Sequence, residues 1–152
     1  MIGELRLEEI ETLLREQTIG RIGCHARGHT HVFPVTYVYD GRAIYGHTGD
    51  GLKVRMMREN PSVCFDVEQL SDLPSWRSVI VVGRFEELHG DEADAAIQRL
   101  VARLDGAPHS ETALPAHGAG RVVPGVEMTS PRQSVVYAIR VEEKTGRFEL
   151  AR

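Results

Sequence analysis

Residues 32–47 read VFPVTYVYDGRAIYGH, in which two runs of strand-forming residues are separated by Asp40–Gly41. The first run, Val32–Tyr39, is rich in β-branched and aromatic side chains, which favour β-strands. Asp-Gly predicts a two-residue hairpin turn, because that turn type needs positive φ angles. Ala43–His47 is therefore expected to pair back on the first run. A parallel doubly wound sheet, which needs crossover connections, is disfavoured.

Outside this hairpin the sequence predicts several more strands and a few helices. Helical spacing of apolar residues predicts helices over 7–17, 51–59 and 91–104, the last with an apolar face of Ala93, Ile97, Leu100, Val101 and Leu104. Strands are predicted over 19–25, 63–67, 76–88 and 134–141, with a turn at 26–29, a polar loop at 71–74 and a bend at Gly146. About six strands joined mainly by hairpins, with two or three helices, indicate a mainly β fold, an antiparallel barrel with added helices.

The composition is that of an ordinary globular protein and disfavours several classes. The 152 residues fit a single domain spanning 1–152, with 41% hydrophobic and 26% charged residues. A net charge of −4 gives no general electrostatic grip on nucleic acid. No apolar run approaches the roughly 20 residues of a membrane span, and the start lacks the apolar core of a signal peptide. We therefore expect a cytoplasmic protein without nucleic-acid or membrane partners.

Three further features of the chain are a long irregular segment, two cysteines and a group of histidines. Residues 106–131 are rich in Gly, Pro, Ala, His and Ser and predict a long irregular loop, usually functional or disordered in a compact domain. Cys24 and Cys64 stand in apolar runs and are interpreted as buried free thiols. Three histidines, a residue type that often binds metals, lie around one hairpin turn: His25, His29 and His31. No acidic residue or cysteine on that turn completes the set, so no metal site is predicted.

The segment YGHTGDGLK, residues 45–53, predicts an anion site where a strand passes into a helix. Backbone N–H groups freed at Gly51, the positive end of the helix and the Lys53 ammonium suit a phosphate. Thr48 adds a hydroxyl at the mouth of the turn. Asp50 counts against a phosphate unless it caps the helix and points away. The alternative for Lys53 is an ordinary solvated lysine, since this is no Walker pattern.

A family resemblance rests on several pieces that occur in order along the chain. They are Pro34–Asp40, Ile44–Thr48 with Gly51–Lys53, Asn60–Val63, Arg77–Gly83, and the ending Val136–Val141 with Thr145–Gly146. Together they resemble the pyridoxamine 5′-phosphate oxidase-like split-barrel superfamily of flavin-binding proteins. Within it, the chain is most similar to the nitroimidazole-resistance (Nim) group. The resemblance covers almost everything except residues 106–131.

The resemblance implies a homodimer of split β-barrels with FMN held in clefts between the subunits. It implies that the 33–37 strand lines the isoalloxazine, that the turn before Lys53 takes the phosphate, and that 76–78 approaches the flavin from either subunit. The implied cofactor-binding residues are Phe33, Pro34, Val35, Thr36, His47, Thr48, Gly51, Lys53, Trp76, Arg77 and Ser78. The plainer alternatives are an ordinary edge strand around Pro34 and a core tryptophan beside a surface arginine.

His47 is the candidate catalytic residue, because it corresponds in place to a histidine that the Nim group carries near the flavin. A proton donor beside a reducing flavin suits nitro or carbonyl reduction, since each hydride equivalent needs a matching proton. The alternative is a partly buried histidine held by a backbone carbonyl.

The function expected from the resemblance is an FMN-dependent oxidoreductase that reduces a small molecule, such as a nitroaromatic, by hydride transfer from the flavin. Alternatives are a non-catalytic flavin or haem carrier, a reductase that uses the deazaflavin F420, and a purely structural dimer. Formation of pyridoxal phosphate is disfavoured, because it needs a second phosphate site. After position 121 the basic residues contain no arginine–histidine motif, being only Arg132, Arg140, Lys144, Arg147 and Arg152.

Overall fold

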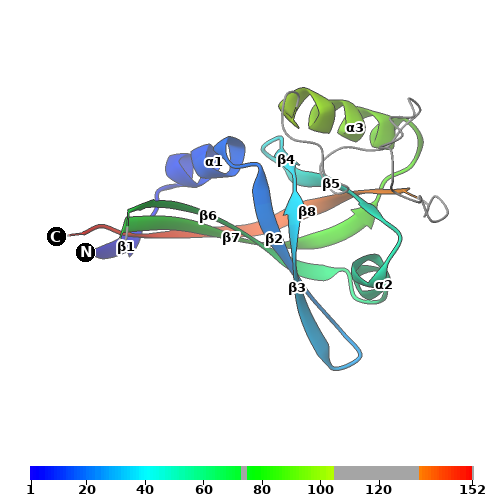
Figure 1. Cartoon of the computed structure of the whole chain (residues 1–152), viewed down its shortest axis with the longest axis horizontal. Helices are drawn as coiled ribbons and strands as arrows, with labels where there is room; N and C mark the ends of the chain where they lie inside the picture. Colours follow the sequence, from blue (N-terminus) through cyan, green and yellow to red (C-terminus); the bar gives the residue numbers. More distant parts are fainter. Residues whose placement is uncertain (73–74, 105–133, 152) are drawn as a thin grey trace, which may run out of the picture.

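Eight strands and three helices make up the part of the chain that the computed structural model describes, residues 1–72, 75–104 and 134–151 (Figure 1). The strands are β1 (Ile2–Glu4), β2 (Ile19–Ala26), β3 (His29–Thr36), β4 (Val38–Tyr39), β5 (Ala43–Gly49), β6 (Ser62–Asp72), β7 (Ser75–Glu87) and β8 (Ser134–Glu149). The helices are α1 (Leu7–Glu16), α2 (Leu52–Glu59) and α3 (Gly90–Leu104). The mainly β, antiparallel fold is confirmed, with eight strands where about six were expected.

The strands form one antiparallel sheet, in which no described ladder joins the two edge strands, β3 and β4. Its order is β3-β2-β6-β7-β8-β5-β4, and β1 pairs with β8. The two ends of this order, β3 and β4, are consecutive in the chain and are joined by Tyr37 alone. The sheet must therefore curl until its two edges meet, which makes a barrel. The prediction of one unbroken strand over Val32–Tyr39 was wrong, because β3 pairs with β2 whereas β4 pairs with β5.

Tyr37 holds this closing point against the first helix. Its side chain is fully buried, and its hydroxyl donates a 2.7 Å hydrogen bond to the carbonyl of Leu14 in α1. Its backbone N–H donates to the carbonyl of Thr18 at 3.0 Å. The ring packs edge-on against Phe65 of β6, with centroids 4.8 Å apart. Tyr37 thus connects the junction between β3 and β4 to α1 and to β6.

The β4–β5 hairpin is confirmed, but its turn lies one residue later than predicted. Tyr39 pairs with Ile44, and the residue with positive φ is Gly41, at 98°, followed by Arg42. Asp40 supports the turn from outside, because one carboxylate oxygen accepts from the N–H groups of Arg42 and Ala43 at 2.8 and 2.9 Å. The β2–β3 hairpin has its predicted turn, and it projects from the body of the molecule (Figure 1).

The apolar side chains form one core inside the barrel and a second under α3. The second core lies between α3 and the outer side of β5 and β8, and its buried members are Ala43, Tyr45, Leu88, Ala96, Val136 and Ala138. β5 is therefore buried on both faces. Leu100 and Leu104 of the predicted α3 face are buried and Ala93 and Ile97 are half-buried, but Val101 is 44% exposed, so its assignment to that face was wrong.

The predicted bend at Gly146 was wrong. Gly146 lies within β8, opposite Val79. A Cβ there would come within 3.0 Å of Leu5 and Ile10, so the absence of a side chain lets α1 and its approach pack onto the strand. Cys24 is buried as expected, whereas Cys64 is exposed on the outer face of β6. The predicted loop at 106–131 and residues 73–74 of the predicted polar loop lie outside the described residues, and Ser71 and Asp72 belong to β6.

Replacing Tyr37 by Phe should destabilise the fold, because the buried carbonyl of Leu14 loses its donor. We expect Tyr37→Phe to lower the free energy of unfolding by about 1–2 kcal/mol in urea titrations. Tyr137→Phe is the matched control, because the buried Tyr137 hydroxyl has no hydrogen-bond partner within residues 1–72, 75–104 and 134–151. That variant should cost less than about 0.5 kcal/mol. Equal losses in the two variants would contradict the role given to Tyr37.

Candidate functional site

The predicted cofactor residues of β3 divide between its two faces. Successive side chains of a strand point to opposite sides, so Phe33 and Val35 share one face and Pro34 and Thr36 the other. Phe33 and Val35 lie on the barrel side, where Val35 is buried and Phe33 packs against the core. Pro34 faces outward and is exposed. The strand therefore has an apolar inner face formed by Phe33 and Val35, and Pro34 and Thr36 lie on its outer face.

Lys53 lies over the ring of Phe33 in a half-buried position. Its ammonium nitrogen is 5.6 Å from the ring centroid, within the range of a cation–π contact. Within the described part of the chain it forms no ion pair with a carboxylate. Burial lowers the pKa of Lys53 below its usual value, because the charged form is partly desolvated. An anion from outside the described residues would stabilise a half-buried cation held in this way.

The start of α2 offers donors for such an anion beside Lys53. Gly51 is the N-cap residue, and no side chain caps the helix there. The N–H groups of the first turn of a helix have no partner within it, and they carry the positive end of the helix dipole. A Cβ at Gly51 would have nothing within 4 Å, so the turn faces open space. Lys53, Gly51 and the first turn of α2 together suit a phosphate group.

Asp50 does not cap the helix, and its charge is engaged elsewhere. Arg58, in the last turn of α2, donates from Nη1 to the two carboxylate oxygens of Asp50 at 3.1 and 3.2 Å. The Nε of Arg58 also donates to Glu87 at the end of β7. The carboxylate of Asp50, which was the argument against a phosphate at this turn, is thus paired with the guanidinium of Arg58. This pairing could not be predicted from the sequence, because Arg58 lies in the last turn of α2 and reaches Asp50 only through its long side chain.

His47 and Thr48 are neighbours in β5 but point to opposite sides of the sheet. Thr48 alternates with Tyr45 and His47 and therefore faces the barrel interior, where it is 5% exposed. His47 is on the side covered by α3, is 8% exposed, and its Nε2 forms a hydrogen bond with the hydroxyl of Ser134. A side-chain hydroxyl therefore orients the imidazole, whereas the sequence alternative was a backbone carbonyl. No contact between described residues joins His47 directly to Lys53.

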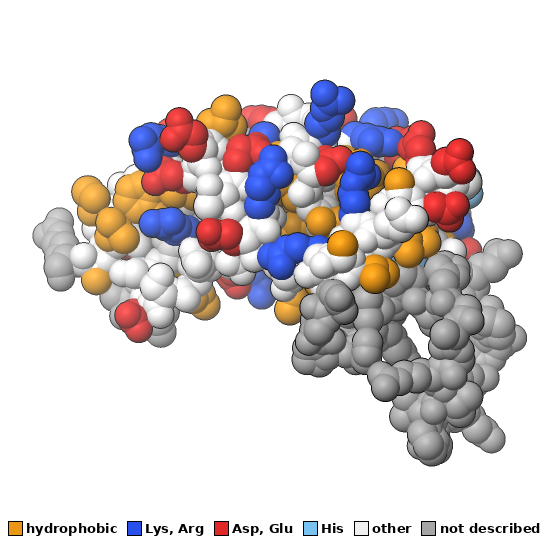
Figure 2. Space-filling model, turned by 90° about the horizontal axis from the view of Figure 1, so that it is seen from above, with side chains coloured by type: hydrophobic (Ala, Val, Ile, Leu, Met, Phe, Trp, Pro, Cys, Tyr) orange, Lys and Arg blue, Asp and Glu red, His pale blue; other side chains and the backbone are white. Residues whose placement is uncertain are grey.

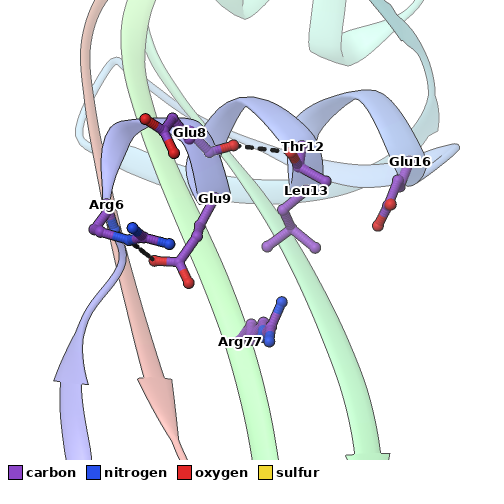
Figure 3. Close-up of a pocket in the computed structure, with 7 residues that line it drawn as sticks. All are labelled: Arg6, Glu8, Glu9, Thr12, Leu13, Glu16 and Arg77. Carbon is purple, nitrogen blue, oxygen red and sulfur yellow. Dashed lines mark hydrogen bonds and ion pairs between the residues drawn. The ribbon is translucent and has the colours of Figure 1, made fainter.

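Arg77 is separated from the phosphate turn and lies beside α1. It projects from β7 toward the helix and lines a cavity of about 240 Å³ (Figure 3). The other lining residues are Arg6, Glu8, Glu9, Thr12, Leu13 and Glu16. This polar hollow does not include Lys53 or any predicted flavin contact other than Arg77. The acidic face of the predicted helix 7–17 was the signal in the sequence that could have indicated it.

Trp76 and Ser78 point away from Arg77, onto the outer face of the sheet. The indole N–H of Trp76 donates to Glu149 at 2.9 Å. Ser78 pairs with Glu68 of β6, β6 pairs with β2, and β2 pairs with β3, where Thr36 lies opposite Ile19. Three strand spacings, about 14 Å, therefore separate Ser78 from Thr36 in one chain. A single subunit brings Phe33 to Lys53 but does not bring residues 76–78 to either.

The side of the molecule that carries α1 and α3 shows no concentration of one charge (Figure 2). Figure 2 views the side that carries α1 and α3, where basic and acidic side chains are interspersed with hydrophobic ones. No helix among the described residues is long and apolar enough to cross a membrane. Within those residues there is also no group of three His, Cys, Asp or Glu side chains placed to hold a metal ion. Of the three histidines near the β2–β3 turn, His25 contacts Thr30 and His31 stacks on Phe33.

The antiparallel sheet with three helices matches split-barrel structures of known proteins. The sequence profile described as pyridoxamine 5′-phosphate oxidase matches residues 6–148, and the chain belongs to this family. The family binds flavins and includes flavin-dependent oxidoreductases.

Known proteins agree with this assignment. A FAD-binding protein from Mesorhizobium loti shares 26% identity with a TM-score of 0.73, covering 99% of each chain. A protein from Bacteroides thetaiotaomicron, proposed to be a 5-nitroimidazole antibiotic resistance protein, shares 18% identity with a TM-score of 0.71, covering 97% of this chain and 87% of that one. An uncharacterized protein of Rhizobium meliloti is 30% identical over 81 residues, 53% of this chain. The chain thus matches about half of that relative, 54% of its length.

Proposed function

We propose that this protein binds FMN and uses it to reduce a small molecule, such as a nitroaromatic compound. The observation that carries the proposal is the half-buried Lys53, which lies over Phe33 beside an uncapped helix start and forms no ion pair with a carboxylate among the described residues. A flavin mononucleotide ends in a phosphate that would supply the missing anion. The Mesorhizobium loti protein binds FAD, which carries phosphates as well and supports a flavin as the ligand.

In this proposal Lys53 and the first N–H groups of α2 hold the phosphate, and the backbone of β3 with the half-buried ring of Phe33 flanks the ring system. Phe33 contributes an aromatic surface, and Pro34, Val35 and Thr36 contribute backbone groups for the polar edge of the flavin. Thr48 and Gly51 lie at the two ends of the turn. When bound and reduced, the flavin would supply a hydride equivalent to the substrate. The residues of the chain bind, orient and exclude water.

His47 is the proposed proton donor for the reduced substrate. Its imidazole is almost completely buried and is held by Ser134, so its ring has one fixed orientation. A held imidazole is suited to delivering a proton in step with a hydride transfer. The proposal places the substrate at the flavin edge nearest to β5.

We also propose a homodimer that forms through the outer face of β2, β3, β6 and β7. That face exposes a row of apolar side chains, of which Ile19 is 62%, Val32 63% and Val82 43% accessible. Pro34, Thr36, Trp76 and Ser78 lie on the same face but on separated strands. A second copy of the chain, seated on this face, would cover the apolar row and bring its residues 76–78 toward the first subunit's β3. The family resemblance supports this arrangement.

The alternatives make different predictions for purified protein. A reductase, once reduced, is reoxidised rapidly by a nitroaromatic, whereas a flavin or haem carrier is not. An F420-dependent protein binds that deazaflavin more tightly than FMN. Mass spectrometry of any released cofactor distinguishes FMN from FAD and haem.

Replacing Lys53 by Met removes the cation but keeps most of the apolar stem. We expect Lys53→Met to weaken FMN binding by about tenfold or more, because a charge-assisted phosphate contact is lost. Riboflavin, which lacks the phosphate, should bind both forms equally. Flavin fluorescence titrations measure both affinities, and an unchanged affinity for FMN would exclude Lys53 as a phosphate ligand.

The same contact predicts a pH dependence of FMN affinity. Only the protonated lysine attracts the phosphate, so affinity should fall as pH rises through the pKa of Lys53, which lies below its usual 10.5. Lys53→Met should lack this alkaline loss. Titrations of both proteins between neutral pH and about pH 10 compare the two profiles.

Replacing His47 by Gln should impair turnover more than cofactor binding. We expect His47→Gln to slow nitroaromatic reduction by about 100-fold, the usual effect of losing a general acid, with little change in FMN affinity. His29→Gln, at the exposed β2–β3 turn, is the matched control and should behave as wild type. Stopped-flow reoxidation of the reduced protein measures the step, and wild-type rates in His47→Gln would leave the residue a structural role.

A lysine in the proposed interface should prevent dimerisation. Val82→Lys places a charge in the apolar row, whereas Val101→Lys does the same on α3, at a valine of almost equal exposure, 44% against 43%. Light scattering should give a 16.9 kDa monomer for Val82→Lys and twice that mass for wild type and Val101→Lys. A wild-type monomer at micromolar concentration would refute the proposed dimer.

A further inference from the structure

The turn between β5 and α2 contains a carboxylate at the place where the proposed function needs an anion to bind. Asp50 directly precedes Gly51 and is only three residues from Lys53. Three residues of extended chain span at most about 10 Å, close to the Debye length at physiological ionic strength. An unpaired Asp50 would therefore repel a phosphate held at Lys53.

Arg58 connects three separate elements around this carboxylate. Its Nη1 contacts the two oxygens of Asp50 at 3.1 and 3.2 Å, and its Nε donates to Glu87. Asp50 belongs to the turn, Arg58 to the last turn of α2, and Glu87 to the end of β7. The two donors are different atoms of one guanidinium, so both carboxylates are held in a fixed geometry.

The guanidinium of Arg58 holds the carboxylate of Asp50 by these hydrogen bonds. Lys53 lies in the first turn of α2 and Arg58 in its last, and the side chain of Lys53 contacts Phe33 instead. The chain thus places two cations near this turn: the guanidinium of Arg58, which reaches back along α2 to Asp50, and the ammonium of Lys53, which lies over Phe33. Without Arg58, the carboxylate of Asp50 would be free to approach Lys53 and compete with a phosphate.

We propose that Arg58 is a positioning residue for the phosphate site, which it keeps open by holding the Asp50 carboxylate away from Lys53. The inference rests on the proposed function, since it concerns the phosphate end of the FMN site. It assigns Arg58 no contact with the phosphate. Its effect on affinity therefore acts through Asp50, and removing the charge of Asp50 should make Arg58 dispensable.

A double-mutant cycle tests this coupling on the full-length protein stripped of any flavin. Arg58→Ala should weaken FMN binding by about fivefold, from one added negative charge near the site, while Asp50→Asn leaves it equal or tighter. The double variant should bind FMN as Asp50→Asn does. Riboflavin affinity should change less than twofold in all three, because riboflavin has no phosphate for Asp50 to repel.

Arg55→Ala is the matched control for the loss of one positive charge. Arg55 is an exposed arginine of the same helix and forms no ion pair within the described residues. Its replacement should change FMN affinity less than Arg58→Ala does. If Arg55→Ala is equally harmful, or if Asp50→Asn fails to rescue Arg58→Ala, the positioning role is refuted and the helix acts by its overall charge.

The stability of each variant and the wild-type affinity separate the remaining outcomes. If Arg58→Ala weakens riboflavin and FMN binding alike and unfolds at lower urea, Arg58 only supports the fold and the proposal is overturned. If wild type binds neither FMN nor riboflavin, the proposed function itself fails. If wild type binds FMN and the cycle shows no coupling, the proposed function stands and the role of Arg58 falls.

Discussion

The barrel depends on the chain changing partners at Tyr37. Before this residue the backbone pairs with β2, and after it with β5, so the two open edges of the sheet become neighbours. A sheet with unpaired edges exposes backbone donors and acceptors. No ladder among the described strands joins β3 to β4 or β5, so the edge of β3 that faces away from β2 is not paired with another described strand. The buried hydroxyl and backbone N–H of Tyr37 are satisfied by Leu14 and Thr18, so the break adds no unpaired polar group. The same bonds dock α1 across the junction.

The packing of β5 also fixes the position of the candidate phosphate site. β5 is buried on both faces, by the barrel core and by α3, so its end is a rigid platform from which the turn to α2 departs. Lys53 therefore meets Phe33 of β3 from a fixed helix rather than from a free loop. Carboxylates near this turn are balanced by Arg58, which links it to the end of β7. The site is built by contacts among three parts of the chain that are distant in sequence.

Local sequence patterns predicted most of the elements and some of the contacts. Alternating β-branched residues and turn dipeptides predicted the strands and hairpins, and all three helices began and ended close to the expected residues. The break at Tyr37 could not be predicted, because strand-forming residues continue on both sides of it from Val35 to Tyr39, and only the choice of pairing partner interrupts the strand. The exposure of Val101 and Cys64 also escaped prediction, since spacing shows a face of an element but not what covers that face.

The sequence by itself determined the antiparallel fold class and the family, and it predicts a phosphate site at the turn around Gly51 and Lys53. These depend on local propensity and on ordered motifs, which are properties of short segments. Only the tertiary structure decided that Lys53 meets Phe33, that His47 is held by Ser134 while Thr48 faces the barrel, and that Arg77 lies beside α1. It also paired Asp50 with Arg58. Such outcomes depend on strand register and sheet closure, which place side chains by contacts between segments far apart in the chain.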